Sequence, residues 1–211
     1  MASDMGRGGG LDELELDALT ELVNIGVGRG ALSLRELVGE QVLLSVPALA
    51  ILSRDEAIAA LGPDELAQLV AVRQGFTGEF SGQALLIFPE ISSLELVRAV
   101  AGRQLALDDI VELEHEALAE IGNIILNGCI GAIANLMQKT LSMSLPEIIK
   151  GTSREFIDLF SGGADDVVLV VRINFLLKGH EISGHVAMVM DLQSLAALKM
   201  LIAEFIRRAT I

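Results

Sequence analysis

Residues 17–24 read DALTELVN, and residues 116–123 read EALAEIGN. Each stretch has an acidic residue, a glutamate four positions later and an asparagine three positions after the glutamate. The matched residues are Glu21 with Glu120 and Asn24 with Asn123. The same pattern at two places in one chain points to an internal repeat, and a repeat has consequences for the whole fold.

Further matches follow in the same order along the chain. They are Pro47 and Pro146, each separated from its asparagine by 22 residues, then SRD at 53–55 with SRE at 153–155, and EFSG at 79–82 with EISG at 181–184. The offset between the copies stays between 99 and 102 residues. Ordered matches at a nearly constant offset indicate a duplicated unit. We therefore expect one domain, residues 11–211, with repeats at about 11–104 and 107–211, after a flexible terminus at 1–10.

Hydrophobic periodicity predicts the same order of elements in both copies. A long helix, a strand leading into the proline, a hairpin and a closing helix are expected at 11–37, 41–47, 71–88 and 92–101, and again at 107–138, 140–146, 166–190 and 192–207. A weaker helix at 55–62 ends at Gly62 and Pro63. Strands joined by short turns pair antiparallel, with helices covering a face. The expected fold is α/β (α+β): a pseudo-two-fold duplicated unit with a largely antiparallel shared sheet and the two long motif-bearing helices on one face.

The composition restricts the partners. The chain has 211 residues, is 52% hydrophobic and carries a formal net charge of −14. This much negative charge repels phosphate backbones and anionic lipids, which argues against nucleic-acid and membrane partners. The apolar run at residues 121–137 is interrupted by asparagines and is short for a membrane span, so we expect a buried helix. Cys129 is the single cysteine, so no internal disulfide can form, which fits the cytoplasm.

Residues three or four apart lie on one face of a helix. Glu21 and Asn24 therefore share a polar stripe, as do Glu120 and Asn123. The carboxylate can pair with a cation, and the carboxamide both donates and accepts hydrogen bonds, which suits it to hold a water molecule. Two alternatives stay open: the pairs are merely solvated, or the asparagines are structural, for example by capping a bend.

Gly26, Gly28 and Ala31 also match the G-x-G-x-x-G/A pattern of dinucleotide-binding loops. Such a loop follows a strand, whereas residues 14–24 have the pattern of an amphipathic helix, so a dinucleotide site is rejected. The glycines, Gly30 included, fit better as places where another backbone comes close or where the helix bends.

Other reactive side chains give no site. Cys129 has no arginine six residues on, as a cysteine phosphatase would, and its apolar neighbours indicate a small buried side chain. His180 and His185 lie five residues apart on a predicted strand, so they point to opposite faces and do not share a metal. His115 is expected to be a solvated helix residue, and no motif supports Ser-His-Asp catalysis.

The repeated acidic-x-x-x-Glu-x-x-Asn pattern, with its proline 22 residues later, resembles the CheC family. The stretch NIGVGRG at 24–30 also resembles the Asn-Ile-Gly-x-Gly opening of that family. The resemblance extends from about residue 11 to the C-terminus. The family contains phosphatases of the chemotaxis response regulator CheY, and CheX and FliY are related to it.

The resemblance implies an activity and a role for each motif residue. The substrate would be the aspartyl phosphate of a CheY-type receiver domain, with Mg²⁺ supplied by the receiver and no cofactor or metal held by this chain. Asn24 and Asn123 would enter the receiver and orient the attacking water, while Glu21 and Glu120 would pair with the receiver's active-site lysine. The alternative left open is a non-enzymatic adaptor for the receptor deamidase CheD or the flagellar switch. Two pseudo-symmetric halves in one chain favour a monomer.

Overall fold

A computed structural model describes residues 11–39, 41–61, 67–101, 107–152, 155–156, 167–177 and 180–209. Its elements, in chain order, are α1 (Glu13–Val38), β1 (Val42–Leu52), α2 (Arg54–Leu61), β2 (Gln68–Thr77), β3 (Gly82–Pro89), α3 (Glu90–Ala101), α4 (Leu107–Leu136), β4 (Ser142–Met143), β5 (Glu147–Thr152), β6 (Val167–Leu177), β7 (His180–Met190) and α6 (Leu192–Ala209). The predicted helices and hairpins are all present. The predicted stop at Gly62 and Pro63 and the match at 153–154 lie outside the described residues.

The strands at the two prolines differ from the prediction. Each was expected to end at its proline. Instead, β1 runs past Pro47, and the second strand is divided into the short β4 before Pro146 and the longer β5 after it. A proline has no N–H to donate to the ladder, so it is confined to edges and irregularities. Accordingly, the pairing of β1 with β6 shifts between Ser45 and Ala48, and a gap separates β4 from β5.

The sheet interleaves the two copies. It has seven antiparallel strands in the order β1-β6-β7-β3-β2-β4, with β5 also paired to β2. The hairpins β2–β3 and β6–β7 therefore meet in the middle, while the first strand of each copy pairs with the hairpin of the other. This arrangement confirms the predicted shared, antiparallel sheet.

The pairing of β3 with β7 locates the pseudo-two-fold axis. Leu85 lies opposite Ala187, and Gln83 lies opposite Val189. The offset of 102 residues that relates EFSG to EISG also relates position 85 to position 187. Exchanging the two copies therefore exchanges Leu85 with Ala187 and maps this pair onto itself. The axis therefore passes through the sheet at this pair.

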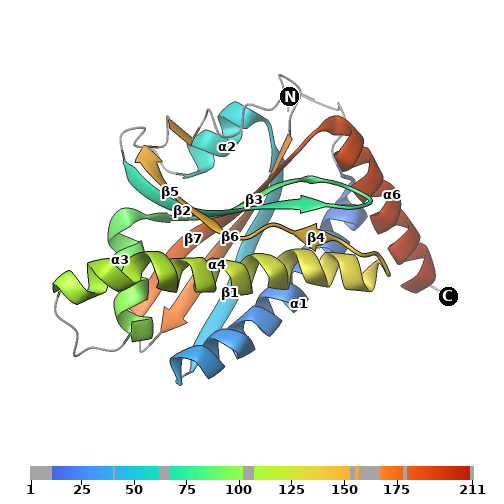
Figure 1. Ribbon diagram of the computed structural model, residues 1–211. Helices are drawn as coiled ribbons and strands as arrows, with labels where there is room; N and C mark the ends of the chain where they lie inside the picture. The colour runs from blue at the N-terminus through green and yellow to red at the C-terminus, as the bar shows by residue number, and fades with distance from the viewer. Residues whose placement is uncertain are drawn as a thin grey trace, which may run out of the picture.

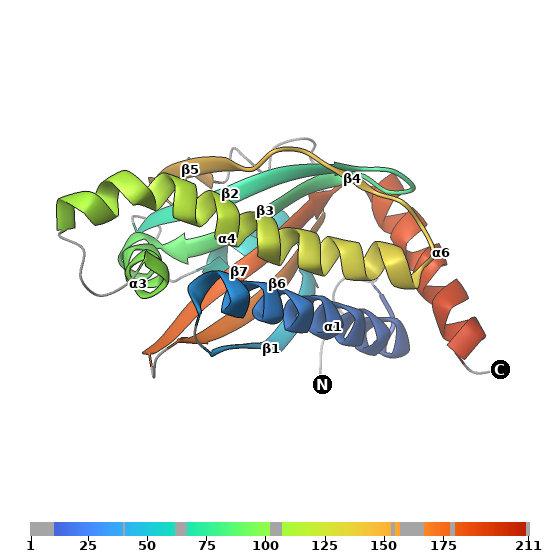
Figure 2. The same ribbon diagram turned by 60° about the horizontal axis from the view of Figure 1, so that its bottom comes forward.

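The helices are divided unequally between the two faces of the sheet. α1 and α4 lie side by side across one face with α3 and α6 at their ends, and α2 covers the opposite face (Figures 1 and 2). Alternate residues of β3 reach the two cores: Leu86 contacts the core under α1 and α4, and Leu85 the one under α2. Residues 113–136 of α4 are apolar and long enough to cross a membrane, yet 56% of their most apolar window is buried inside the protein. They form a core helix, as predicted.

α1 is continuous from its cap to its end. The Asp12 carboxylate accepts a hydrogen bond from the Glu15 N–H (2.8 Å), and the Glu15 carboxylate accepts one from the Asp12 N–H (2.9 Å). This capping box satisfies N–H groups that have no partner inside the helix. Gly39, with φ of 71°, ends the helix in the left-handed conformation that favours glycine.

α1 and α4 touch through glycine. A Cβ atom on Gly26 would lie 2.4 Å from the carbonyl oxygen of Gly128, and one on Gly128 would lie 2.9 Å from the carbonyl oxygen of Gly26. Either distance is too short for a carbon atom, so the two backbones approach closely only because both residues lack side chains. Gly28, in contrast, is exposed and has no atom within 4 Å of such a Cβ. The predicted close approach is therefore confirmed at Gly26 and does not occur at Gly28.

This crossing gives a matched pair of substitutions. Gly26→Ala should lower the free energy of unfolding by about 1–3 kcal/mol, because the new methyl group overlaps the backbone of α4. Gly28→Ala should raise it by about 0.5–1 kcal/mol, because alanine is the better helix former and nothing opposes it. Urea denaturation followed by circular dichroism measures both changes. Equal effects of the two substitutions would contradict the close contact at Gly26.

Candidate functional site

Both predicted Glu/Asn pairs lie on the outer side of the helix layer. Glu21, Asn24 and Glu120 are exposed, and Asn123 is half-buried. The residues on the inward sides of the same helices are buried. They include Leu22 and Val23 on α1 and Ile121 and Gly122 on α4. The helical spacing thus places each pair where another molecule can reach it.

The two pairs form separate sites. α1 and α4 are antiparallel: Gly26 faces Gly128, and Gly30 faces Ile124. Asn123 is therefore level with about residue 31 of α1, and a rise of 1.5 Å per residue separates it from Asn24 by about 10 Å along the helices. The two pairs are therefore distinct positions along the helix layer.

A cleft of about 680 Å³ opens beside the second pair. It is bordered by α1, α3, α4 and the segment before β5, through Leu37, Val100, Leu113, Glu116, Ala117, Ala119, Glu120, Asn123, Leu145 and Pro146. The Leu145 side chain is 85% exposed. An apolar cleft with two carboxylates and a carboxamide at its border has the character of a binding site for a protein segment or a small ligand.

The Asn123 side chain is held by two carboxamide donors. Its Oδ1 accepts hydrogen bonds from Nε2 of Gln74 (3.2 Å) and from Nδ2 of Asn127 (2.6 Å). Gln74 is 1% exposed and belongs to β2, so this contact joins the helix layer to the sheet.

The segment that contains Pro146 contributes to the same contact. The Ser144 carbonyl oxygen accepts a second hydrogen bond from Nε2 of Gln74, at 2.8 Å. Ser144 is itself fixed to Gly75, because its N–H donates to the Gly75 carbonyl (2.8 Å) and its hydroxyl oxygen accepts from the Gly75 N–H (2.9 Å). The asparagine and the proline segment of this copy therefore meet through Gln74.

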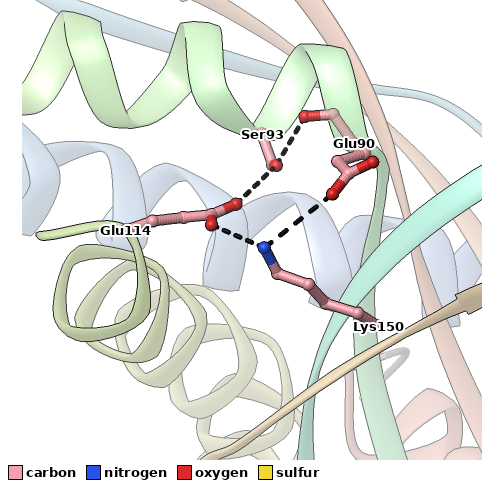
Figure 3. Close-up of polar contacts among 4 residues, drawn as sticks. All are labelled: Glu90, Ser93, Glu114 and Lys150. Carbon is pink, nitrogen blue, oxygen red and sulfur yellow. Dashed lines mark hydrogen bonds and ion pairs between the residues drawn. The ribbon is translucent and has the colours of Figure 1, made fainter. Parts of the chain in front are cut away.

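A buried carboxylate anchors the part of α4 before the second pair. Glu114 is 5% exposed; its carboxylate accepts hydrogen bonds from Nζ of Lys150 on β5 (2.6 Å) and from the Ser93 hydroxyl on α3 (3.4 Å) (Figure 3). The Lys150 ammonium also lies 3.9 Å from the carboxylate of Glu90. These contacts tie α4 to α3 and to β5, and they fix the stretch of α4 that borders the cleft.

Known proteins of one group are similar to this chain. Residues 70–159 match the family described as chemotaxis phosphatase CheX. Over 197 residues the chain is 25% identical to the CheY-P phosphatase CheC of Bacillus subtilis (strain 168), covering 90% of this chain and 94% of that protein. The chain is similar to the CheC, CheX and FliY group.

FliY proteins extend the similarity to the fold. The chain is 24% identical to the flagellar motor switch phosphatase FliY of B. subtilis over 200 residues, which are 92% of this chain and 50% of that protein. It therefore spans only about half of that FliY. The crystal structure of Thermotoga maritima FliY superposes with a TM-score of 0.73 at 17% identity, covering 92% of this chain and 98% of that one. The fold is thus that of the CheC, CheX and FliY group.

The residues around the motif were not predicted from the sequence. Gln74, Asn127 and Glu114 were not among the predicted site residues, although each carries a signal. Asn127 lies one helical turn after Asn123. Gln74 takes an inward position in the alternation of Val70, Val72 and Phe76, and Glu114 takes one in the helical stripe of Leu118, Ile121 and Ile125. A polar residue at an inward position is expected to have a buried partner.

Cys129 and His185, two of the side chains for which no role was predicted, are buried and partly buried, respectively. Burial raises the pKa of the Cys129 thiol to about 12, so it is not a nucleophile at neutral pH. Burial and the nearby Arg172 lower the pKa of His185, which lies on β7. The side chain of His180 is outside the described residues. In the described part of the chain, no three His, Cys, Asp or Glu side chains are grouped to hold a metal ion.

The buried carboxylate predicts a difference between two lysines. Lys150→Met should lower the free energy of unfolding by about 1–3 kcal/mol, because the buried Glu114 loses a charged hydrogen bond. The control is Lys139→Met, which removes the exposed pair with Glu79 (3.0 Å) and should cost less than about 1 kcal/mol. Thermal denaturation at neutral pH measures both, and a larger loss for Lys139→Met would contradict the role given to Glu114.

Proposed function

We propose that this chain is a phosphatase that hydrolyses the aspartyl phosphate of a CheY-type receiver domain. The observation that carries the proposal is the placement of the two Glu/Asn pairs, each presented outward from a rigid helix. Similarity to a named CheY-P phosphatase over nine-tenths of the chain supports the substrate class.

The chemistry needs little from the enzyme beyond positioning. A water molecule attacks phosphorus in line with the acyl oxygen, the P–O bond to the aspartate breaks, and the carboxylate leaves with the electron pair. Holding the water and the phosphoryl group in line accounts for most of the catalysis in reactions of this class. Asn24 and Asn123 would supply the positioned carboxamides, and Mg²⁺ would belong to the receiver.

The glutamates would fix the docking. Glu21 and Glu120 are exposed and lie one helical turn before the asparagines, so a lysine of the receiver can pair with the carboxylate while the carboxamide reaches the phosphoryl group. The apolar cleft beside Glu120 offers further contact area to the receiver. A role as adaptor for CheD or for the flagellar switch stays a prediction from the sequence, since no contact described here favours it.

Replacement of the asparagines tests the activity. We expect Asn24→Ala and Asn123→Ala each to remove part of the dephosphorylation, and the double substitution to lower kcat by at least about 100-fold, because the water is no longer positioned. The measurement is phosphate release from a receiver phosphorylated with acetyl phosphate. Asn135→Ala, an exposed carboxamide elsewhere on α4, is the control and should keep full activity. Undiminished hydrolysis by the double variant would refute the proposal. Receiver binding without hydrolysis by the wild type would favour the adaptor.

Replacement of the glutamates tests the docking. Glu21→Gln and Glu120→Gln in one chain should raise KM about tenfold, with a smaller change in kcat, because a charge pair with the receiver is lost. The dependence of KM on salt should weaken as well, since that pair is screened by ions. Glu95→Gln, an exposed carboxylate on α3, serves as the control. An unchanged KM with unchanged salt dependence would exclude the lysine contact.

A further inference from the structure

We propose that Gln74 and Asn127 are positioning residues that lock the Asn123 carboxamide, so that the second Glu/Asn pair is pre-organised and the first is not. The catalytic consequence rests on the proposed function, whereas the lock itself is a property of the unbound chain. It gives the two halves unequal tasks despite their identical motifs.

Two backbone carbonyls determine how the lock is oriented. The Ser144 carbonyl can only accept, so the side-chain nitrogen of Gln74, 2.8 Å away, must be the donor. In the same way, the Asn123 carbonyl fixes Nδ2 of Asn127, 2.8 Å away, as a donor. Both nitrogens also contact the Asn123 side chain, which must therefore present its oxygen to them.

The lock decides which atom of Asn123 meets a ligand. Two donors fill the two acceptor positions of Oδ1. Nδ2 has no hydrogen-bond partner among the described residues, and Asn123 borders the cleft. A phosphoryl oxygen or a water molecule at this site would therefore be bound by the two N–H bonds of Nδ2.

Burial makes the lock effective. Gln74 is 1% exposed, and hydrogen bonds are stronger in such surroundings than in water. Gly122 allows the approach: a Cβ there would lie 2.4 Å from Cγ1 of Val72, so α4 reaches β2 only without a side chain at this position. A carboxamide that is already ordered loses less conformational entropy when the receiver docks.

The first pair lacks each part of the lock. Gly28 stands where Asn127 stands in the second copy, four residues after the motif asparagine. Val23 stands in place of Gly122. The strand β6 is the counterpart of β2, and its inward positions are taken by apolar residues, Val171 and Ile173, instead of a glutamine. Asn24 is exposed and has no recorded side-chain partner among the described residues. Its carboxamide must be ordered by the receiver.

Removal of the Gln74 donor tests the lock in two backgrounds, each with one active pair. Gln74→Met keeps the size of the side chain and removes the donor; in an Asn24→Ala background it should lower kcat about fivefold with KM retained, as expected for one neutral hydrogen bond. The fall should be absent where Asn123 has been replaced by alanine, because only the first pair acts there. Gln68→Met on the same strand controls for the substitution. An equal fall in both backgrounds, or none in either, overturns the proposal.

Transfer of the second donor tests it by gain of function. In an Asn123→Ala background, Gly28→Asn places a carboxamide one turn after Asn24, in open space. It should raise kcat about two- to fivefold, whereas Gly28→Ala, which also favours the helix, should not. Equal activities of the two variants count against positioning by the carboxamide.

Side-chain NMR tests the lock without any substrate. In the unbound wild type the Asn123 NH₂ group should show a higher order parameter than that of Asn24, and Gln74→Met should lower it. Equal, low order parameters for the two asparagines overturn the lock. This readout does not depend on the activity, so it keeps the lock distinct from a failure of the proposed phosphatase function.

Discussion

The close contact of α1 and α4 at Gly26 and Gly128 determines where every other part of the site can be. Because the two backbones touch, the helices form a single layer that covers one face of the sheet (Figure 2). Their apolar sides pack into one core. The polar sides of the two helices therefore face outward, away from the sheet. The antiparallel crossing separates the two Glu/Asn pairs along this layer, so one support presents two candidate sites.

The sheet below this layer depends on both halves of the chain. The strand on the outer side of each hairpin comes from the other copy. β1 of the first copy pairs with β6, and β5 of the second copy pairs with β2. Unpaired strand edges are costly and prone to aggregate, so each copy supplies what the other lacks. The edge strand β5 also carries Lys150, whose contact with Glu114 ties the edge of the sheet to α4.

The sequence was sufficient for most of the features that repeat or are periodic. The long helices, the hairpins and the shared antiparallel sheet follow from apolar spacing and from the echo of one copy in the other. The path of the chain at Pro47 and Pro146 did not follow, because a proline ends a central strand but is tolerated at an edge or an irregularity.

Contacts between elements remote in the chain were also beyond the sequence analysis. Gln74 and Asn123 are 49 residues apart and meet only because Gly122 lets α4 approach β2. Polar residues at inward positions, such as Gln74 and Glu114, indicate that buried hydrogen bonds exist, but the sequence does not show which residues are their partners. The placement of the motif residues could thus be predicted, whereas the surroundings that distinguish the two pairs could not.

The exchange of first strands has a consequence for how far the two halves of such a molecule can differ. A single unit could satisfy its sheet only by pairing with an identical unit, and in that symmetric dimer every substitution would appear at both sites at once. Covalent joining removes that obligation. Gly122 and Asn127 in one half then need no counterpart in the other, where Val23 and Gly28 stand, so one Glu/Asn pair can be held rigid while the other stays adaptable.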